Sequence, residues 1–86
     1  MASYSLDIKR SAGKELAELP KRDRLRIVTR IQALAHEPRP PGCEKLSGQE
    51  RYRICQGDYR ILYEIHDDGL IVMVVKIGHR RDVHRK

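Results

Sequence analysis

The amino-acid sequence predicts an α+β fold in which two N-terminal helices pack on one face of a small antiparallel sheet. Three observations support this prediction. The first half of the chain spaces its apolar residues as helices do, the second half changes to the two-residue period of strands, and 86 residues suffice for a single core. Helices and strands that are segregated along a chain favour an α+β layer pair. We therefore expect one domain, residues 1–86, with the order β-α-α-β-β-β.

The N-terminal half predicts one strand followed by two helices. Residues 4–8 alternate apolar and polar side chains, as in a half-buried strand. A short helix is then expected from Ser11, as its cap, to about Leu19. Pro20 ends that helix and suits the start of a second one over residues 21–36. The second helix is expected to bury one apolar stripe, made of Leu25, Ile27, Val28, Ile31, Leu34 and Ala35.

The C-terminal half predicts a meander of three strands at residues 51–56, 59–66 and 70–77. Gly57-Asp58 separates the first two strands, and Asp68-Gly69 separates the last two; both dipeptides are typical of tight hairpin turns. Residues 70–75 are apolar on both faces, which predicts a central position for the third strand.

A two-residue turn at Gly57-Asp58 determines which side chains share a face. Arg53 then lies opposite Leu62, and Arg51 lies opposite Glu64. A slip of one residue would put the arginines in the core, so the burial pattern supports this register. One face is expected to hold Arg51, Arg53, Cys55 and Arg60, and the core face to hold Tyr52, Ile54, Ile61 and Tyr63 as packing residues.

Because the third strand runs back toward Arg60, the tail that follows it brings Arg80 to the same end of the sheet. Arg53, Arg60 and Arg80 are expected to surround one phosphate, since the planar fork of arginine donors suits phosphate oxygens. Arg51 is expected to contact a neighbouring phosphate or to pair with Glu64. The alternative is that these are ordinary surface arginines with acidic neighbours.

Composition favours an acidic partner. The chain has 18 Lys+Arg and 12 Asp+Glu, and its formal charge of +6 suits nucleic acid, an anionic membrane surface or an acidic protein. No signal peptide is apparent, and the longest apolar run is too short to cross a bilayer. Cys43 and Cys55 are expected to be reduced thiols in a cytoplasmic protein. The histidines and cysteines lack metal-ligand spacing, so we expect no metal and no cofactor.

An ordered set of fragments extends over nearly the whole chain: YSLDIK at 4–9, KLSG at 45–48, YRI at 52–54, GDYRILY at 57–63 and VKIGHRRDV at 75–83. In these fragments, their order and their spacing, the chain resembles the RelE/ParE toxin superfamily of prokaryotic toxin–antitoxin systems. The resemblance implies the β-α-α-β-β-β fold and a cognate antitoxin. For the RelE-like branch it implies metal-independent cleavage of mRNA in the ribosomal decoding site; for the ParE-like branch it implies inhibition of DNA gyrase.

The resemblance also implies which residues act. The catalytic positions of the RelE-like branch match Arg51, Arg53, Arg60, Arg80 and His84. Two departures from the family pattern are arginines in place of lysines at the first two positions and His84 in place of a tail tyrosine. We assign Arg53, Arg60, Arg80 and His84 to catalysis, and RNA or phosphate binding to Arg51, Lys45, Arg81 and Arg85.

Arginine can stabilise the charge of a cleaving phosphate but cannot accept a proton, because its pKa exceeds about 12. An unperturbed histidine is available in both protonation states near neutral pH, so His84 is expected to exchange a proton with the 2′-hydroxyl or the leaving 5′-oxygen, with His79 as the fallback. The surrounding arginines favour its role as a base.

The sequence favours an mRNA endoribonuclease over a gyrase inhibitor without nuclease activity. A third hypothesis, an operator-binding co-repressor acting with the antitoxin, is compatible with either. Arg22, Arg26 and Arg30 share one side of the second helix and suit DNA phosphates or an acidic antitoxin equally well.

Overall fold

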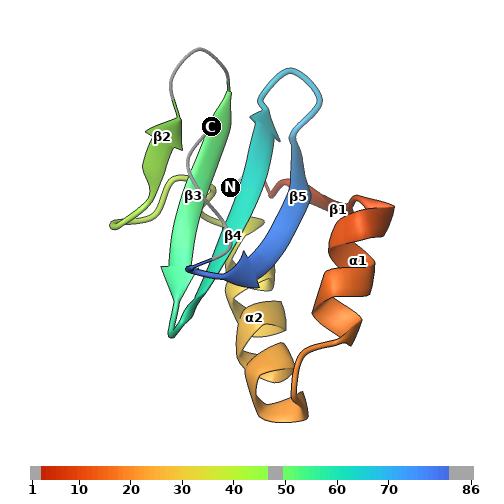
Figure 1. Ribbon diagram of the computed structural model, residues 1–86. Helices are drawn as coiled ribbons and strands as arrows, with labels where there is room; N and C mark the ends of the chain where they lie inside the picture. The colour runs from red at the N-terminus through yellow and green to blue at the C-terminus, as the bar shows by residue number, and fades with distance from the viewer. Residues whose placement is uncertain (1–2, 47–49, 82–86) are drawn as a thin grey trace.

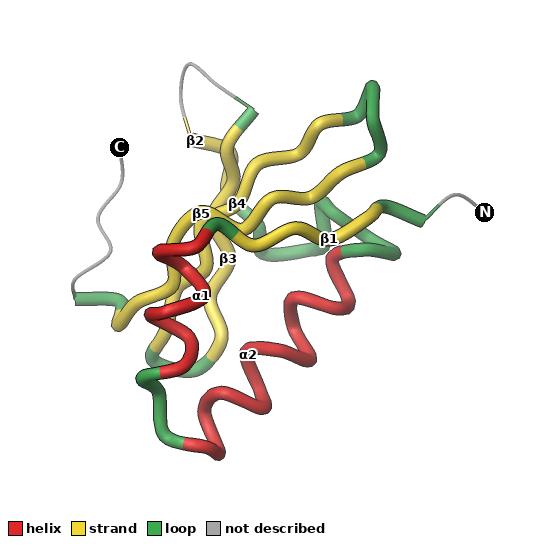
Figure 2. Tube along the Cα trace, turned by 90° about the vertical axis from the view of Figure 1, so that its right-hand side faces the viewer, coloured by secondary structure: helices red, strands yellow, loops and turns green. Residues whose placement is uncertain are grey.

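The computed structural model describes residues 3–46 and 50–81 and has one five-stranded sheet with two helices on one of its faces (Figures 1 and 2). The predicted α+β class is therefore confirmed. The elements are β1 (Ser5–Ile8), α1 (Arg10–Ala17), α2 (Lys21–Leu34), β2 (Glu44–Leu46), β3 (Arg51–Gln56), β4 (Tyr59–His66) and β5 (Ile71–His79).

The sheet differs from the predicted antiparallel one in two respects. Its order is β1-β5-β4-β3-β2, and β1 pairs with β5 in parallel, so the sheet is mixed. A parallel neighbour is possible because two helices carry the chain across the sheet between β1 and the meander. The second difference is β2, a three-residue strand that pairs antiparallel with β3 and forms the other edge.

The hairpin register predicted for β3 and β4 is confirmed. Arg51 pairs with Glu64, Arg53 with Leu62, and Cys55 with Arg60. Gly57 has φ of +62° and the following Asp58 does not have a positive φ, as in the tight turn that places glycine first. The arginines of the two strands lie on the side of the sheet away from the helices, as predicted.

The turn between β4 and β5 is longer than the predicted Asp68-Gly69 dipeptide. It occupies residues 67–70, and its left-handed position is Leu70 (φ +53°) rather than the glycine. The backbone N–H of Leu70 donates to the carbonyl oxygen of Asp67 (3.2 Å) and closes the turn. β5 lies between β1 and β4, so its predicted central position is confirmed.

The helices begin and end near the predicted residues, but two details were wrong. Ser11 lies inside α1, whose N-cap is Lys9 without a side-chain cap. Leu25 was expected in the core, yet it is 56% exposed. The face of α2 that packs on the sheet carries Ile27, Ile31 and Leu34, and Leu25 lies about half a turn away from it.

The core lies between the helices and the sheet. Tyr52 and Tyr63 pack there with ring centroids 5.8 Å apart, as predicted, and the Tyr63 hydroxyl donates to the carbonyl oxygen of Pro38 (2.7 Å). Fully or nearly buried side chains from both layers complete the core: Ala12, Ile27, Ile31, Leu34, Ile54, Ile61, Ile65, Val72, Val74 and Ile77.

The predicted half-burial of β1 was wrong, because all four of its residues are exposed. It lies at the sheet edge, where only Tyr4, just before the strand, packs against the core. Among the described residues, no helix combines the length and apolar character that crossing a membrane requires.

Candidate nucleic-acid interface

The face of the sheet opposite the helices carries the arginines of the meander. We define the arginine face as Arg51, Arg53 and Arg60 together with Cys55 and Leu62, which the β3–β4 register places on one side. Leu62 is buried against Leu46 and Val75 in a small apolar cluster. The cluster packs beside the charged side chains on this face of the sheet, and the strands determine where those side chains lie.

Arg53 is the most enclosed of these arginines. It is only 8% exposed, and Glu44 lies opposite it on β2. The Arg53 guanidinium donates to the Glu44 carboxylate through Nε (2.9 Å) and through a second, shorter contact from a terminal nitrogen. Arg53 is therefore neutralised by an internal carboxylate, and a phosphate would have to share it with Glu44 or displace that side chain.

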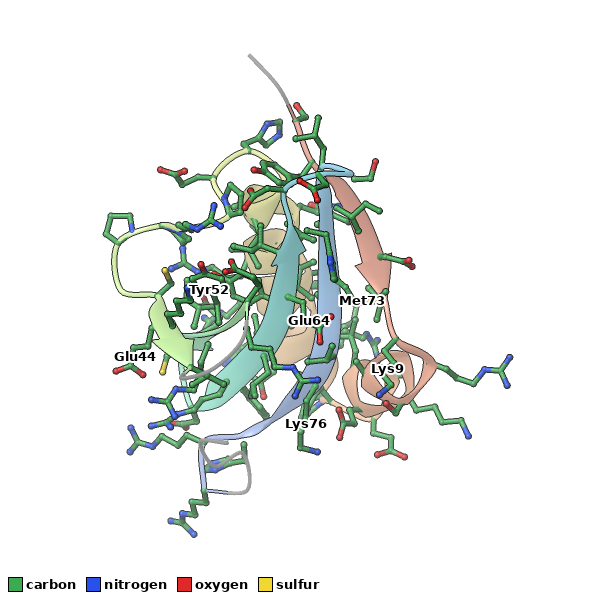
Figure 3. All side chains as sticks on the ribbon, turned by 90° about the horizontal axis from the view of Figure 1, so that it is seen from above. Lys9, Glu44, Tyr52, Glu64, Met73 and Lys76 are labelled. Atoms are coloured by element: carbon green, nitrogen blue, oxygen red, sulfur yellow. The ribbon has the colours of Figure 1, made fainter. Side chains whose placement is uncertain are left out.

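Arg51 also has a carboxylate partner. Its Nε donates to Glu64 (3.0 Å) directly across the hairpin, and His66 contacts the other oxygen of the same carboxylate (3.1 Å). Burial opposes ionisation of Glu64, but the hydrogen bonds from Arg51 and His66 outweigh it and hold the Glu64 pKa below its usual value. Figure 3 labels Glu44 at one edge of the sheet and Glu64 near its centre. The predicted pairing of Arg51 with Glu64 is thus confirmed.

Arg60 differs from Arg51 and Arg53 in its hydrogen bonding. Its side chain is half-buried, and its Nε is buried with no hydrogen-bond partner among the described residues. Within residues 3–46 and 50–81, no carboxylate forms an ion pair with it. Buried donors are almost always paired, so an unsatisfied arginine donor is a favourable position for an incoming anion.

Arg80 is held at the same end of the sheet, as predicted. Gly78 pairs with Arg60, and the backbone N–H of Arg80 donates to the carbonyl oxygen of Asp58 in the β3–β4 turn (2.8 Å). The chain that carries Arg80 is therefore fastened to the hairpin that carries Arg60. Both arginines occupy one corner of the sheet.

The path of β5 toward this corner is controlled by a bulge at Val75, where the β4–β5 register shifts. Glu15 of α1 fastens the strand just beyond the bulge. Its carboxylate accepts hydrogen bonds from the backbone N–H of Ile77 (2.9 Å) and from Lys76 Nζ (2.8 Å). A helix residue thereby helps to set the direction in which the chain reaches Arg80.

Other predicted site residues are not on the arginine face. Lys45 pairs with Tyr52 and so points to the opposite side of the sheet, where it contacts Glu50 (3.4 Å). His79 shares the helix side with Tyr59, and its Nδ1 accepts a hydrogen bond from the Arg81 backbone N–H (3.2 Å). His79 is therefore turned away from the arginine face.

Arg81 is exposed in the turn after β5. His84 and Arg85, which the sequence also assigns to the site, lie outside the described residues. In the part of the chain that the structure describes, no three acidic, histidine or cysteine side chains gather as a metal site would require.

Glu44 is the residue at this site that sequence reasoning missed. A signal was present, because Ser47-Gly48 separates two short segments and could have been read as a turn. Pairing residues 44–46 with 51–53 across that turn would have placed Glu44 opposite Arg53. The segment was too short for its alternation to be recognised as a strand.

Comparisons with known proteins show which family the chain resembles. Residues 6–84 match the family model described as the ParE toxin of the type II toxin–antitoxin system. The toxin RelG of Mycobacterium tuberculosis is 30% identical over 87 residues, which cover 96% of this chain and 98% of RelG.

Solved structures of similar proteins share the fold over almost their entire length. The RelBE2 toxin–antitoxin complex of Mycobacterium tuberculosis matches with a TM-score of 0.83 at 27% identity, covering 95% of this chain and 97% of that one. The archaeal RelE–RelB complex of Pyrococcus horikoshii matches with a TM-score of 0.83 at 28% identity, covering 94% and 99%. The isolated RelE toxin of E. coli matches with a TM-score of 0.80 at 26% identity, covering 98% and 88%. The chain belongs to the ParE toxin family of type II toxin–antitoxin systems, within the RelE/ParE superfamily.

Proposed function

We propose that this toxin is an endoribonuclease that cleaves mRNA in the ribosomal decoding site and so inhibits translation in the cytoplasm. The observation that carries the proposal is Arg60, a half-buried arginine whose Nε has no partner among the described residues. It lies at the corner to which Arg80 is fastened. An unsatisfied fixed cation in a positively charged chain suits the phosphate of a bound RNA strand.

The proposed reaction is attack by the RNA 2′-hydroxyl oxygen on the adjacent phosphorus. A new 2′ O–P bond forms and the P–O5′ bond breaks, which leaves a 2′,3′-cyclic phosphate and a 5′-hydroxyl end. Arg60 and Arg80 stabilise the additional negative charge of the five-coordinate phosphorus, since fixed cations aimed at developing charge supply the largest catalytic effects. Arg53 holds the same or the adjacent phosphate after exchange with Glu44.

Two proton movements accompany these bond changes. The 2′-hydroxyl loses a proton to a general base, and the leaving 5′-oxygen takes one from solvent. We assign His84 to the first movement, because no arginine has a usable neutral form and His79 is turned to the other side of the sheet. The assignment rests on the family motif, as His84 is outside the described residues.

We further propose a cognate antitoxin as the protein partner. The similar structures include a RelBE2 complex and a RelE–RelB complex, each of which contains a toxin with its antitoxin. Operator DNA is a proposed partner of the toxin–antitoxin complex.

The proposed function is tested by inducing the toxin and mapping RNA 5′ ends on translating ribosomes. Codon-phased cuts with 5′-hydroxyl ends are expected for the wild type. Arg60→Ala is expected to lower the yield of these ends at least 100-fold, in line with the loss of one charge-stabilising group. Arg10→Ala removes an exposed arginine of α1 and serves as the matched control. Intact mRNA with the wild-type toxin would exclude the nuclease.

A second candidate is inhibition of DNA gyrase, which is favoured by the ParE description of the matching family model. This function would not require RNA cleavage, and the arginine face would serve only as a binding surface. Trapped gyrase–DNA complexes together with intact mRNA would select it.

A further inference from the structure

His79 is the last residue of β5, and the proposed cleavage does not use its side chain. It pairs with Tyr59 at the start of β4, on the helix side of the sheet. The His79 ring is partly buried and meets the Tyr59 ring edge-on, with ring centroids 5.8 Å apart and an angle of 70° between the planes. Aromatic rings attract one another in this edge-to-face arrangement. The neighbouring strand therefore helps to orient the imidazole.

The Tyr59 ring is connected in turn to α2. Its hydroxyl donates a hydrogen bond to the carboxylate of Asp23 in the first turn of that helix (3.0 Å). The ring also packs against the hydrophobic core between the layers. His79 therefore rests on a side chain that both the sheet and a helix hold in place.

The imidazole of His79 accepts a hydrogen bond from the chain that leaves β5. The backbone N–H of Arg81 donates to Nδ1 (3.2 Å). A ring nitrogen accepts only when it carries no proton, so the neutral ring has its proton on Nε2. Asparagine and aspartate form the same kind of contact with the N–H two residues later in Asx turns. His79 thus serves as a local acceptor in the turn after β5.

This contact completes the fastening of Arg80. The N–H of Arg80 donates to the carbonyl oxygen of Asp58 (2.8 Å), and the N–H of Arg81 donates to His79. These two N–H groups belong to the planar peptide units on either side of the Arg80 Cα. Because both units are held, the direction in which the Arg80 side chain leaves the backbone is held as well.

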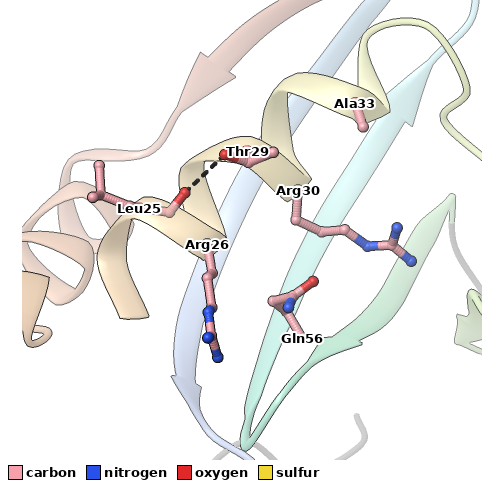
Figure 4. Close-up of a pocket in the computed structure, with 6 residues that line it drawn as sticks. All are labelled: Leu25, Arg26, Thr29, Arg30, Ala33 and Gln56. Carbon is pink, nitrogen blue, oxygen red and sulfur yellow. Dashed lines mark hydrogen bonds between the residues drawn. The ribbon is translucent and has the colours of Figure 1, made fainter. Parts of the chain in front are cut away.

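The His79 ring has space on two sides. Hollows of about 290 Å³ and 370 Å³ border it, the first toward α2 and the second toward α1. Arg26 extends from α2 beside Gln56, and both side chains line the first hollow (Figure 4). The contacts with Tyr59 and with the Arg81 N–H therefore determine where the ring lies.

We propose that His79 is a positioning residue for Arg80, which holds the turn after β5 so that Arg80 lies at the corner with Arg60. The inference rests on the proposed function for the role of Arg80 at the cleaved phosphate. It adds a side chain that acts through Arg80 without contacting RNA. A misplacement of about 1 Å can lower a rate about 100-fold, so loss of the anchor affects the chemical step rather than RNA binding.

Proton transfer is the alternative role for His79. A general base must come within hydrogen-bond reach of the 2′-hydroxyl, whereas His79 shares the helix side of the sheet with Tyr59 and its Nδ1 is occupied. Asparagine at this position separates the two roles. Its side-chain oxygen can accept from the Arg81 N–H, but its amide does not titrate.

The test measures single-turnover cleavage of mRNA on ribosomes by the full-length toxin. His79→Ala is expected to lower the rate of the chemical step about 10-fold. The ribosome concentration that gives the half-maximal rate should change less than about twofold, because His79 does not contact RNA. His79→Asn should stay within about threefold of the wild-type rate, since the acceptor is kept. The matched control is His36→Ala, at an exposed histidine after α2, which should cleave as the wild type does.

A double-mutant cycle tests whether His79 acts through Arg80. If it does, adding His79→Ala to Arg80→Ala should cause no further loss of rate. NMR relaxation follows the backbone directly, and the Arg80 and Arg81 amides should be more mobile in His79→Ala than in the wild type or His79→Asn. Circular dichroism and melting curves first establish that each variant is folded.

The outcomes separate this inference from the proposed function. A wild-type rate in His79→Ala, or a full further loss in the Arg80→Ala background, overturns the positioning role while leaving the nuclease intact. Equal losses in His79→Asn and His79→Ala overturn it as well and identify proton transfer or the ring itself as the requirement. Intact mRNA with the wild-type toxin overturns the proposed function and the catalytic part of the inference, whereas unchanged amide mobility in His79→Ala overturns the anchor itself.

Discussion

Arg53 and Glu44 face each other across β3 and β2, and the Arg53 guanidinium makes two hydrogen bonds to one oxygen of the Glu44 carboxylate. The Arg53 side chain is 9% exposed, whereas that of Glu44 is 60% exposed. The carboxylate therefore lies between a buried cation and the solvent from which a phosphate would arrive. Glu44 can act as an internal competitor for the RNA backbone.

Replacement of Glu44 tests this competition. In Glu44→Gln the amide still accepts a hydrogen bond from Arg53 but no longer repels phosphate. RNA affinity, measured with a catalytically inactive Arg60→Ala background, is expected to rise about threefold to tenfold. The free energy of unfolding is expected to fall by about 1 kcal/mol, since one partner of the pair is largely solvated.

Glu37→Gln is the matched control for this charge change, because Glu37 is exposed in the connection after α2. Equal effects of the two substitutions on RNA affinity would show that only net charge matters and that Glu44 has no specific role.

Glu15 is expected to position the corner that carries Arg80. Glu15→Ala removes both the acceptor for the Ile77 N–H and the partner of Lys76, so cleavage should fall about 10-fold. Glu15→Gln keeps an acceptor for the Ile77 N–H and should recover most of the lost rate.

Glu18→Ala, one turn further along the sequence and exposed, should leave cleavage unchanged. A rate for Glu15→Ala equal to the wild-type rate would show that the strand holds its direction without this contact. Single-turnover kinetics would measure the chemical step directly.

The Asp67 carboxylate links three segments and should make stability depend on pH. It accepts hydrogen bonds from Arg39 (2.9 Å) and from the Tyr4 hydroxyl (2.6 Å), and these hold the Asp67 pKa below its usual value. The pKa of an Asp in an unfolded chain is about 3.9, so the unfolded chain takes up this proton before the folded chain does as the pH falls. The stabilisation is therefore complete above about pH 5 and is lost as the pH falls below about 4 toward the folded-state pKa.

Denaturant unfolding of the wild type and Asp67→Asn at several pH values measures this contribution. The difference in unfolding free energy between them should be constant above about pH 5 and should shrink in acid. Asp68→Asn, at an exposed position in the same turn, serves as the control. A difference that does not change with pH would contradict the linkage.

Substitutions in the two turns of the meander are expected to change stability in opposite directions. Gly57 has φ of +62°, and no atom lies within 4 Å of the place that a Cβ would occupy, so Gly57→Ala should lower the free energy of unfolding by about 1 kcal/mol through backbone strain alone.

Leu70 has φ of +53° and is 40% exposed. Leu70→Asn should therefore raise stability by about 0.5 kcal/mol, because asparagine tolerates the left-handed region better. Thermal melting monitored by circular dichroism would measure both changes.

His84 provides the pH-dependent part of the proposed reaction. If it acts as the general base, the cleavage rate should rise with pH as the imidazole loses its proton and then reach a plateau. His84→Ala should lower the rate about 100-fold or more and abolish that rise. His36→Ala replaces an exposed histidine after α2 and should keep the wild-type profile. An unchanged pH profile in His84→Ala would remove this residue from the mechanism.

The sequence by itself determined the features that depend on local pattern. The two-residue period of β3 and β4, with Gly57 at the turn, admits a single register that buries the tyrosines and leaves the arginines on the other face. The helices were predictable for a similar reason, although the prediction that Leu25 is buried was wrong. The corner formed by Arg60 and Arg80 followed from strand direction.

Only the tertiary structure decided which long-range partners those residues acquire. The parallel pairing of β1 with β5, the short β2, and the fastening of β5 by Glu15 join segments far apart in the chain or too short to show a period. Such contacts depend on how the layers pack, and local alternation carries no information about them. Glu44 differs in part, because the Ser47-Gly48 dipeptide could have indicated that its segment pairs with that of Arg53. Only the structure showed the ion pair between them, which changes Arg53 from an open phosphate ligand into one half of that pair.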